Sequence, residues 1–196
     1  TRSGRVTGVQ TCALPILRSG NDAAAVLALF AADNMSDAVA LMNKEAKSLG
    51  ATESNFVNPH GLYDDNHYTT AYDLYLIFNE AIKYSKFVDT LSCMKYTGSF
   101  TRKTAYGDYS IGCSYTNSNG FLTGSYATPD GIKVYGGKAG YTEVARRSYV
   151  MLAESNNGHK YIIITMRAES NSLMYKDLSA LLNKIPVDKK SYADNE

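Results

Sequence analysis

The first half of the chain carries apolar residues at the spacing of helices. Residues 23–32 are nearly all apolar and rich in alanine, a strong helix former, so we expect a helix that is buried on every side. A second helix is expected over residues 36–49, capped by Ser36 and followed by Gly50, where a left-handed residue commonly ends a helix. A third helix is expected over residues 70–84, opened by its first residue, a threonine.

The second half of the chain changes to the patterns of strands and turns. Residues 93–115 are rich in Tyr, Thr, Ser and Gly, which favours short strands or a hairpin. Further strands are expected at residues 133–141, 148–153 and 161–166. Residues 156–158, Asn-Asn-Gly, form a turn signal between the last two, and residues 172–184 predict a closing helix. Helices followed by an antiparallel sheet and a final helix indicate an α+β fold.

Composition narrows the function classes. The 196 residues are 44% apolar and 20% charged, which suits one globular domain with a core. Lys and Arg total 20 against 19 Asp and Glu, with no block of like charge, so a nucleic-acid surface is not indicated. The longest apolar run, residues 23–32, is far shorter than the roughly 20 residues of a membrane-spanning helix.

The first sixteen residues fit none of these patterns. They show no periodicity and lack the long apolar stretch of a secretory signal. The run VTGVQTCALPI at residues 6–16 resembles a translated sequencing adapter, so we interpret residues 1–16 as foreign; a native disordered arm is the alternative. We then expect the domain to occupy residues 17–184, residues 185–196 to be a linker or tail, and the native protein to continue upstream of Leu17.

Two short motifs bear on chemistry. Ser19-Gly20-Asn21 stands where the first helix begins, and residues 137–142, Gly-Lys-Ala-Gly-Tyr-Thr, stand on a predicted strand. Each is weak alone, since a Ser-x-Asn before a helix is commonly only a cap. Their order along the chain, helix-borne Ser-x-Asn followed by strand-borne Lys-x-Gly, resembles that of the active-serine penicillin-binding enzymes.

Longer stretches carry the same resemblance. They are Asn-Pro-His-Gly-Leu at 58–62, His-Tyr-Thr-Thr-Ala-Tyr-Asp-Leu at 67–74, Asn-Ser-Asn-Gly-Phe-Leu at 117–122 and Asp-Gly-Ile-Lys at 130–133. Over residues 17–184 the chain resembles the serine-type D-alanyl-D-alanine carboxypeptidases, the low-molecular-weight penicillin-binding proteins of peptidase family S11. This resemblance implies an incomplete β-lactamase/transpeptidase-like fold. It also implies that the protein acts outside the cytoplasmic membrane. The implied partners are the peptidoglycan pentapeptide and β-lactams, without cofactor, metal or nucleic acid, and with membrane association only through parts missing from this chain.

The resemblance also implies residue roles. Ser19 would shuttle a proton near the leaving amine, Asn21 would hold the substrate amide, and Lys138 would place positive charge beside the terminal carboxylate and the Ser19 hydroxyl. The backbone N–H of Tyr141 would donate to the oxyanion, and Thr142 would line the same strand edge. The expected substrate-binding residues are Ala139, Gly140, Tyr141 and Thr142.

The chain departs from the family pattern in three places. Its one Ser-x-x-Lys, from Ser92 to Lys95, follows Ser-x-Asn instead of preceding it and lies in an expected strand, so we interpret it as coincidence and expect this chain to be inactive. Ala139 replaces a threonine whose hydroxyl helps to bind the substrate carboxylate, a contact of about 1.5–3 kcal/mol. Arg146 and Arg147 could supply that contact or be solvated charges on a strand edge, and we favour solvated charges.

Other interpretations remain open at this point. A class A β-lactamase-like hydrolase is one, although no Glu-x-x-Leu-Asn segment is found. A non-catalytic peptidoglycan-binding protein is another, and Ala139 is its best support. The pair His60 and His67 flanks two aspartates, but a loop gives no fixed ligand geometry, so no metal site is expected. Cys93 and Cys113 are expected to be free buried thiols, with a disulfide as the alternative.

Overall fold

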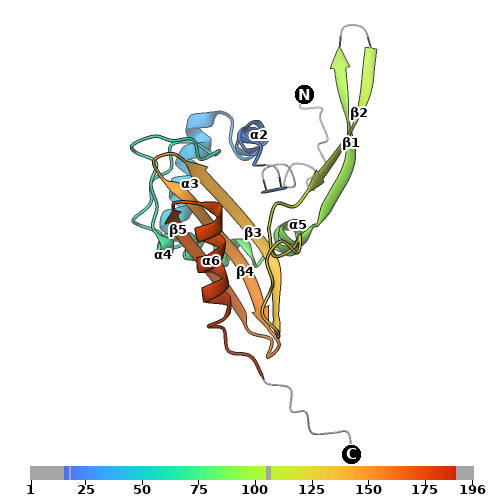
Figure 1. The fold of residues 1–196 in the computed structure, drawn as a ribbon. Helices are drawn as coiled ribbons and strands as arrows, with labels where there is room; N and C mark the ends of the chain where they lie inside the picture. The colour runs from blue at the N-terminus through green and yellow to red at the C-terminus, as the bar shows by residue number, and fades with distance from the viewer. Residues whose placement is uncertain (1–15, 18, 105–106, 189–196) are drawn as a thin grey trace, which may run out of the picture.

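The computed structural model describes residues 16–17, 19–104 and 107–188, and it confirms the α+β order of elements (Figure 1). The helices are α2 (Asn21–Ala31), α3 (Met35–Ser48), α4 (Ala71–Ala81), α5 (Ser85–Ser92) and α6 (Asn171–Leu182). The strands are β1 (Lys95–Thr104), β2 (Gly107–Thr116), β3 (Ile132–Thr142), β4 (Arg146–Ser155) and β5 (Lys160–Ala168). Residues 1–15 and 189–196 lie outside the described residues, so the assignments of a foreign segment and of a terminal tail stay predictions.

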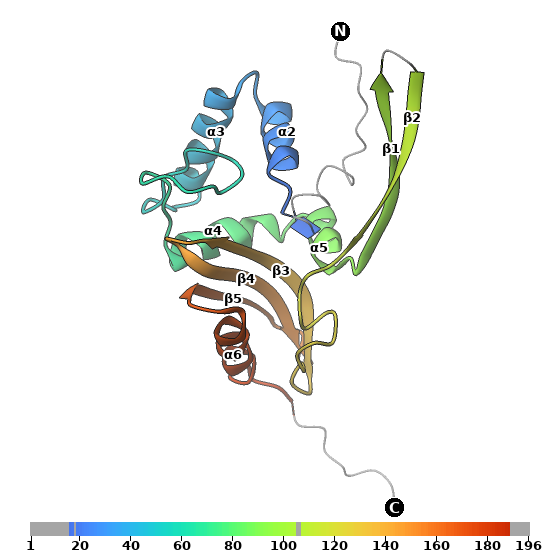
Figure 2. The same ribbon diagram turned by 45° about the horizontal axis from the view of Figure 1, so that its top comes forward.

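The strands form two antiparallel sheets. Strands β3, β4 and β5 lie in that order, with Ala139 opposite Tyr149 and Met151 opposite Ile163. Strands β1 and β2 form the hairpin predicted for residues 93–115, and it projects away from the larger sheet (Figure 2). Helices α4 and α5 cover one face of the larger sheet, and α6 covers the other (Figure 2).

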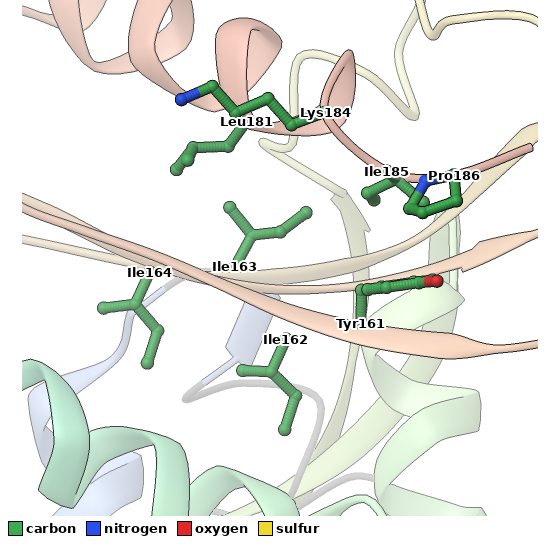
Figure 3. A pocket seen from close by; sticks show the side chains of 8 residues that line it. All are labelled: Tyr161, Ile162, Ile163, Ile164, Leu181, Lys184, Ile185 and Pro186. Atoms are coloured by element: carbon green, nitrogen blue, oxygen red, sulfur yellow. The ribbon is translucent and has the colours of Figure 1, made fainter.

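The core therefore has two parts, one on each face of the larger sheet. Successive side chains of β5 point to opposite faces of the sheet and so enter different parts of the core. Ile163 points toward α6, whereas Ile162 and Ile164 point to the opposite face (Figure 3). A pocket of about 380 Å³ lies between β5 and the end of α6. The α6 side holds the larger buried cluster, which includes Tyr149, Met151, Leu178 and Leu182.

The expectation that the first helix is buried on every side is wrong. No residue of α2 is buried, and Val26, Leu29 and Phe30 are 45%, 44% and 57% exposed. Among the described elements α2 packs mainly against α3, and together they line an apolar groove of about 620 Å³. No single described helix is long and apolar enough to cross a membrane; the pair α2 and α3 passes that test together, but with an 82° bend between them.

The ends of the helices show which polar residues cap them. Helix α3 is capped by Asn34, whose side chain accepts the Asp37 N–H at 2.9 Å, rather than by Ser36. The threonine predicted to open α4 does so, since the Asp73 N–H donates to Thr70 Oγ1 at 3.1 Å. The expected helix 70–84 stops at Ala81, and a separate helix, α5, follows it.

Buried asparagines hold the irregular segment between β2 and β3. Asn119 is 1% exposed; its Oδ1 accepts the N–H groups of Phe121 and Leu122 at 2.9 and 3.1 Å, and its Nδ2 donates to the Tyr149 hydroxyl at 2.8 Å. Asn117 donates to the Leu91 carbonyl at 3.0 Å. The segment thus ties β4 and α5 together, because its side chains replace the backbone partners that a strand would provide.

Candidate active site

Strand β3 carries most of the predicted site, and two glycines set its path. At Gly136, whose φ is 125°, an added Cβ would lie 2.2 Å from the Leu91 carbonyl oxygen of α5. At Gly137 it would lie 2.1 Å from the Val150 carbonyl oxygen of β4. Only glycine permits such close backbone approach, so the pair determines where residues 138–142 lie.

A pocket of about 260 Å³ brings the two motifs together at the edge of the sheet. It is lined by Ser19, Ala139, Gly140, Tyr141, Arg147, Asn171 and Met174. Ser19 does not cap α2, because the N-cap residue is Gly20 and no side chain bonds there. Its φ of 53° is unusual for a residue other than glycine. The simple helix-cap interpretation of Ser19 therefore does not hold, and Ser19 lines the pocket beside residues 139–141 instead.

Three predicted site residues, Asn21, Lys138 and Thr142, do not line this pocket. Asn21 is exposed at the first position of α2. Ala139 packs against the cluster on the α6 side, so alternation places Lys138 on the opposite face. The Lys138 amine is half-buried, donates to the Ala139 carbonyl, and has its pKa lowered by desolvation.

Thr142 lines a second pocket, of about 460 Å³, which continues from Gly140 and Tyr141 toward the loop at residues 61–69. The Thr142 hydroxyl accepts the Ala145 N–H at 3.0 Å, so it closes the turn between β3 and β4. His67 lines the same pocket; burial lowers its pKa, and the nearby Asp64 partly opposes that shift.

Arg147 is the charged residue of the smaller pocket. The register pairs Arg147 with Tyr141, and its guanidinium carbon lies 4.5 Å from the centre of the Tyr141 ring. Its Nε is buried and has no hydrogen-bond partner among the described residues. Arg147 is therefore half-buried rather than the fully solvated charge that we expected, whereas Arg146 is exposed, as expected. The sequence could have indicated the position of Arg147. A short turn directly after β3 places residue 147 opposite residue 141 in the antiparallel pair.

The Ser-x-x-Lys within the chain is placed away from both pockets. Ser92 is the last residue of α5, not part of a strand as expected, and its hydroxyl donates to the Val88 carbonyl at 3.0 Å. Lys95 begins β1, so the two side chains do not share a helix face. The interpretation as coincidence is unchanged, although the expected strand was wrong for Ser92.

The described residues contain no group of three or more His, Cys, Asp or Glu side chains placed to hold a metal ion. The His67 Nδ1 accepts the Val57 N–H at 3.2 Å. Cys93 and Cys113 are free thiols, half-buried rather than buried.

Lys138→Met is expected to raise the free energy of unfolding at pH 7 by about 1 kcal/mol, because a half-buried ammonium is replaced by an apolar chain of similar length. The folded-state pKa of Lys138 lies below its ordinary value of 10.5. Between these two values the unfolded chain binds a proton that the folded chain has released, so the stability of the unaltered chain rises with pH. The advantage of methionine should therefore shrink toward pH 10.5, as urea unfolding at pH 7 and pH 10 would measure.

Lys133→Met is the matched control, since Lys133 is an exposed lysine on the same strand. It removes a cation–π contact of 4.3 Å to Tyr135 and should give no gain in stability. A Lys138→Met variant that is less stable than the unaltered chain at pH 7 would contradict the burial argument.

Comparisons with known proteins agree with this fold. The sequence profile of the D-alanyl-D-alanine carboxypeptidases matches residues 2–170. D-alanyl-D-alanine carboxypeptidase DacF of Bacillus subtilis is 33% identical over 146 residues, which cover 73% of this chain and 33% of the relative. The chain spans about a third of the length of the curated relatives it matches.

Solved structures extend the likeness to three dimensions. Penicillin binding protein 5 from Haemophilus influenzae superposes with a TM-score of 0.72 at 27% identity, covering 89% of this chain and 46% of that one. The Streptomyces K15 DD-transpeptidase gives a TM-score of 0.76 at 25% identity, covering 89% and 66%. These neighbours confirm the expected transpeptidase-like α+β fold. The chain therefore belongs to the D-alanyl-D-alanine carboxypeptidase family.

Proposed function

We propose that the protein containing this chain removes the terminal D-alanine from peptidoglycan stem peptides through an acyl-enzyme. The observation that carries this proposal is the pocket in which Ser19 meets Ala139, Gly140 and Tyr141 at the edge of β3. Membership of the family supports the same chemistry.

The nucleophile of the proposed reaction lies outside this chain, on a Ser-x-x-Lys segment. Its hydroxyl attacks the carbonyl between the two D-alanines, and the neighbouring lysine takes the proton, because a serine at its ordinary pKa is a poor nucleophile. The Ser19 hydroxyl relays a proton to the leaving amine, so D-alanine departs neutral at its nitrogen and an ester remains. Water then attacks that ester and restores both the serine and the carboxylate of the shortened peptide.

The strand residues would bind the substrate around this bond. Strand β3 is at the edge of the larger sheet, so every second backbone N–H and C=O points away from β4, where an extended peptide can pair with it. In this arrangement the Tyr141 N–H donates to the oxyanion and Gly140 leaves space for the peptide. Asn21 would hold the substrate amide and Lys138 would contribute positive charge, although neither lines the pocket that contains Ser19.

The substrate determines where the protein would work. Peptidoglycan is assembled on the outer side of the cytoplasmic membrane, so we propose an extracytoplasmic location. The same pocket would accept β-lactams, whose acyl bond takes the place of the D-alanyl-D-alanine amide.

Fluorescent penicillin labelling tests the proposal. A longer protein, in which this chain follows a Ser-x-x-Lys segment, should be labelled covalently and should release D-alanine from an acylated Lys-D-Ala-D-Ala peptide. The 196-residue chain should not be labelled, because the Ser92 hydroxyl is bonded to its own helix, away from the pocket. Denaturing gel fluorescence and D-alanine release measure the two outcomes.

Three results would contradict the proposal. A covalent adduct on the 196-residue chain would show that its own residues supply the nucleophile. A longer protein that hydrolyses benzylpenicillin rapidly without releasing D-alanine would be a β-lactamase. One that binds the peptide but is neither labelled nor active would be a peptidoglycan-binding protein, which the methyl group of Ala139 in place of a hydroxyl also favours.

A further inference from the structure

We propose that the hairpin of β1 and β2 binds the glycan strand of peptidoglycan along one of its faces. This inference rests on the proposed function, because the glycan strand is the polymer to which the stem peptides are attached. The proposed surface is separate from the candidate active site, since neither of its two pockets is lined by a described residue of β1 or β2.

The two faces of the hairpin differ in composition. Side chains two positions apart on a strand share a face, and the register then places one set of aromatic and apolar residues together. We call this set the tyrosine face; it consists of Tyr96, Tyr109, Ile111 and Cys113. The opposite face carries small hydroxyl residues along its middle: Thr97, Ser99, Thr101, Ser110 and Ser114.

The hairpin extends into solvent without support from the rest of the fold. It projects from the body of the protein (Figure 2), and among the described elements its two strands contact each other and little else. Tyr109 lies toward its outer end and is 54% exposed. A two-stranded hairpin is only marginally stable by itself, so an apolar face of this kind gains stability when another surface packs on it.

A glycine allows an aromatic ring to lie along the strand. A Cβ added at Gly98 would lie 2.7 Å from the hydroxyl oxygen of Tyr96 and 3.0 Å from a ring carbon, so the Tyr96 ring extends over Gly98. The Tyr115 ring is nearly parallel to the Tyr96 ring, at 8°, with 6.4 Å between their centres. Tyrosine combines an apolar ring with a hydroxyl that donates and accepts hydrogen bonds. A sugar ring has the matching features, an apolar face and a rim of hydroxyl groups.

The dimensions of the tyrosine face suit a linear polymer better than a second copy of the chain. Its strands of ten residues make it roughly 30 Å long, and two strands about 4.8 Å apart make it roughly 10 Å wide. The resulting area of roughly 300 Å² is less than half of the about 800 Å² that each partner buries in a stable protein interface.

The charge of the tyrosine face agrees with a neutral polymer. Arg102 is the one charged position among the residues that β1 and β2 pair on this face, and it lies opposite Tyr109 near the outer end. A nucleic acid or another polyanion would require a row of Lys and Arg. The sugars of a glycan strand are N-acetylated, and their carboxyl groups are used in the links to the peptides, so the polymer is largely uncharged.

Binding of a glycan without peptides tests the proposal. The probe is a soluble hexasaccharide of N-acetylglucosamine, titrated into the 196-residue chain and followed by ligand-observed NMR. The unaltered chain should bind it, and Tyr109→Ala should weaken binding by about threefold to tenfold through loss of one aromatic contact. Gly98→Ala should weaken it as well, because the new methyl group displaces the Tyr96 ring without removing it. Only the outer end of a flexible side chain has to move, so this variant should remain folded.

Two variants serve as matched controls. Thr97→Ala changes the opposite face of β1, and Tyr84→Ala removes a tyrosine that is 63% exposed but lies outside the hairpin. Both should bind the hexasaccharide as the unaltered chain does. Circular dichroism melting establishes that each variant is folded, so weaker binding by a folded Gly98→Ala variant supports the proposal independently of Tyr109→Ala.

The outcomes separate this inference from the proposed function. If the unaltered chain does not bind the hexasaccharide, or if Tyr109→Ala and Gly98→Ala bind it as well as the controls do, this inference is overturned and D-alanine release by the longer protein is unaffected. If binding depends on the tyrosine face but the longer protein releases no D-alanine, the proposed function fails and the glycan site stands. Light scattering after gel filtration tests the remaining occupant: a dimer that Tyr109→Ala converts to a monomer would assign the tyrosine face to a second copy of the chain and overturn the inference.

Discussion

Gly137→Ala is expected to lower the free energy of unfolding by about 3 kcal/mol, because the new methyl group has no space. Its Cβ would lie 2.1 Å from the Val150 carbonyl oxygen, and 2.6 Å from a ring carbon of Tyr149. The first neighbour is backbone in the central strand of the sheet, so it cannot rotate away as a flexible side chain could. Urea unfolding followed by circular dichroism measures the change.

Gly140→Ala is the matched control on the same strand. No heavy atom lies within 4 Å of the Cβ that it would add, and its φ is not in the left-handed region. We expect a change within about 0.5 kcal/mol, or a slight stabilisation, because alanine restricts the unfolded chain. Similar losses of stability for the two variants would contradict this argument. They would show that any glycine replaced on β3 has the same effect, whether or not it lies close to the backbone of β4.

The clash expected in Gly137→Ala would also affect the candidate site. Lys138 and the four residues after it follow directly along β3, so a displacement of the strand at Gly137 moves all of them. Arg147 would move relative to Tyr141 as well, since the two are paired across β3 and β4. The glycines that precede the Lys-x-Gly motif are therefore part of how the sheet presents the pocket.

Sequence patterns predicted the elements that depend on local signals. The strand 161–166, the turn at residues 156–158 and the final helix all lie where expected, because alternation, turn residues and helical spacing are local properties. Burial of α2 was not predictable in the same way. An apolar helix is buried only where other elements cover it, and among the described elements α3 is its main neighbour.

The candidate site, too, was predicted from the sequence only in part. The resemblance linked Ser19 to the Lys-x-Gly strand, and the structure places Ser19 beside residues 139–141. It does not place Lys138 in that pocket, because which face of a strand a residue occupies depends on the register of the whole sheet. The buried Nε of Arg147 likewise depends on what surrounds it, and exposure cannot be read from a strand-edge position alone.

Asn119→Ala is expected to destabilise the chain by about 3 kcal/mol, the second large effect. The substitution leaves the N–H groups of Phe121 and Leu122 without their acceptor and the hydroxyl of Tyr149 without its donor. Each buried polar group that loses its partner costs about 1–3 kcal/mol, and the site is 1% exposed, so water cannot readily replace the amide. Thermal and urea unfolding give the change in stability.

Asn183→Ala is its control, because that asparagine is exposed and its amide donates to Ser179 of its own helix at 2.8 Å. We expect a change below about 0.5 kcal/mol there. If both asparagine variants were equally stable, the resemblance at residues 117–122 could not be explained by folding. Those residues line neither pocket of the candidate site. A large loss for Asn119→Ala alone would therefore assign them to the junction of α5, β4 and α6 rather than to contact with substrate.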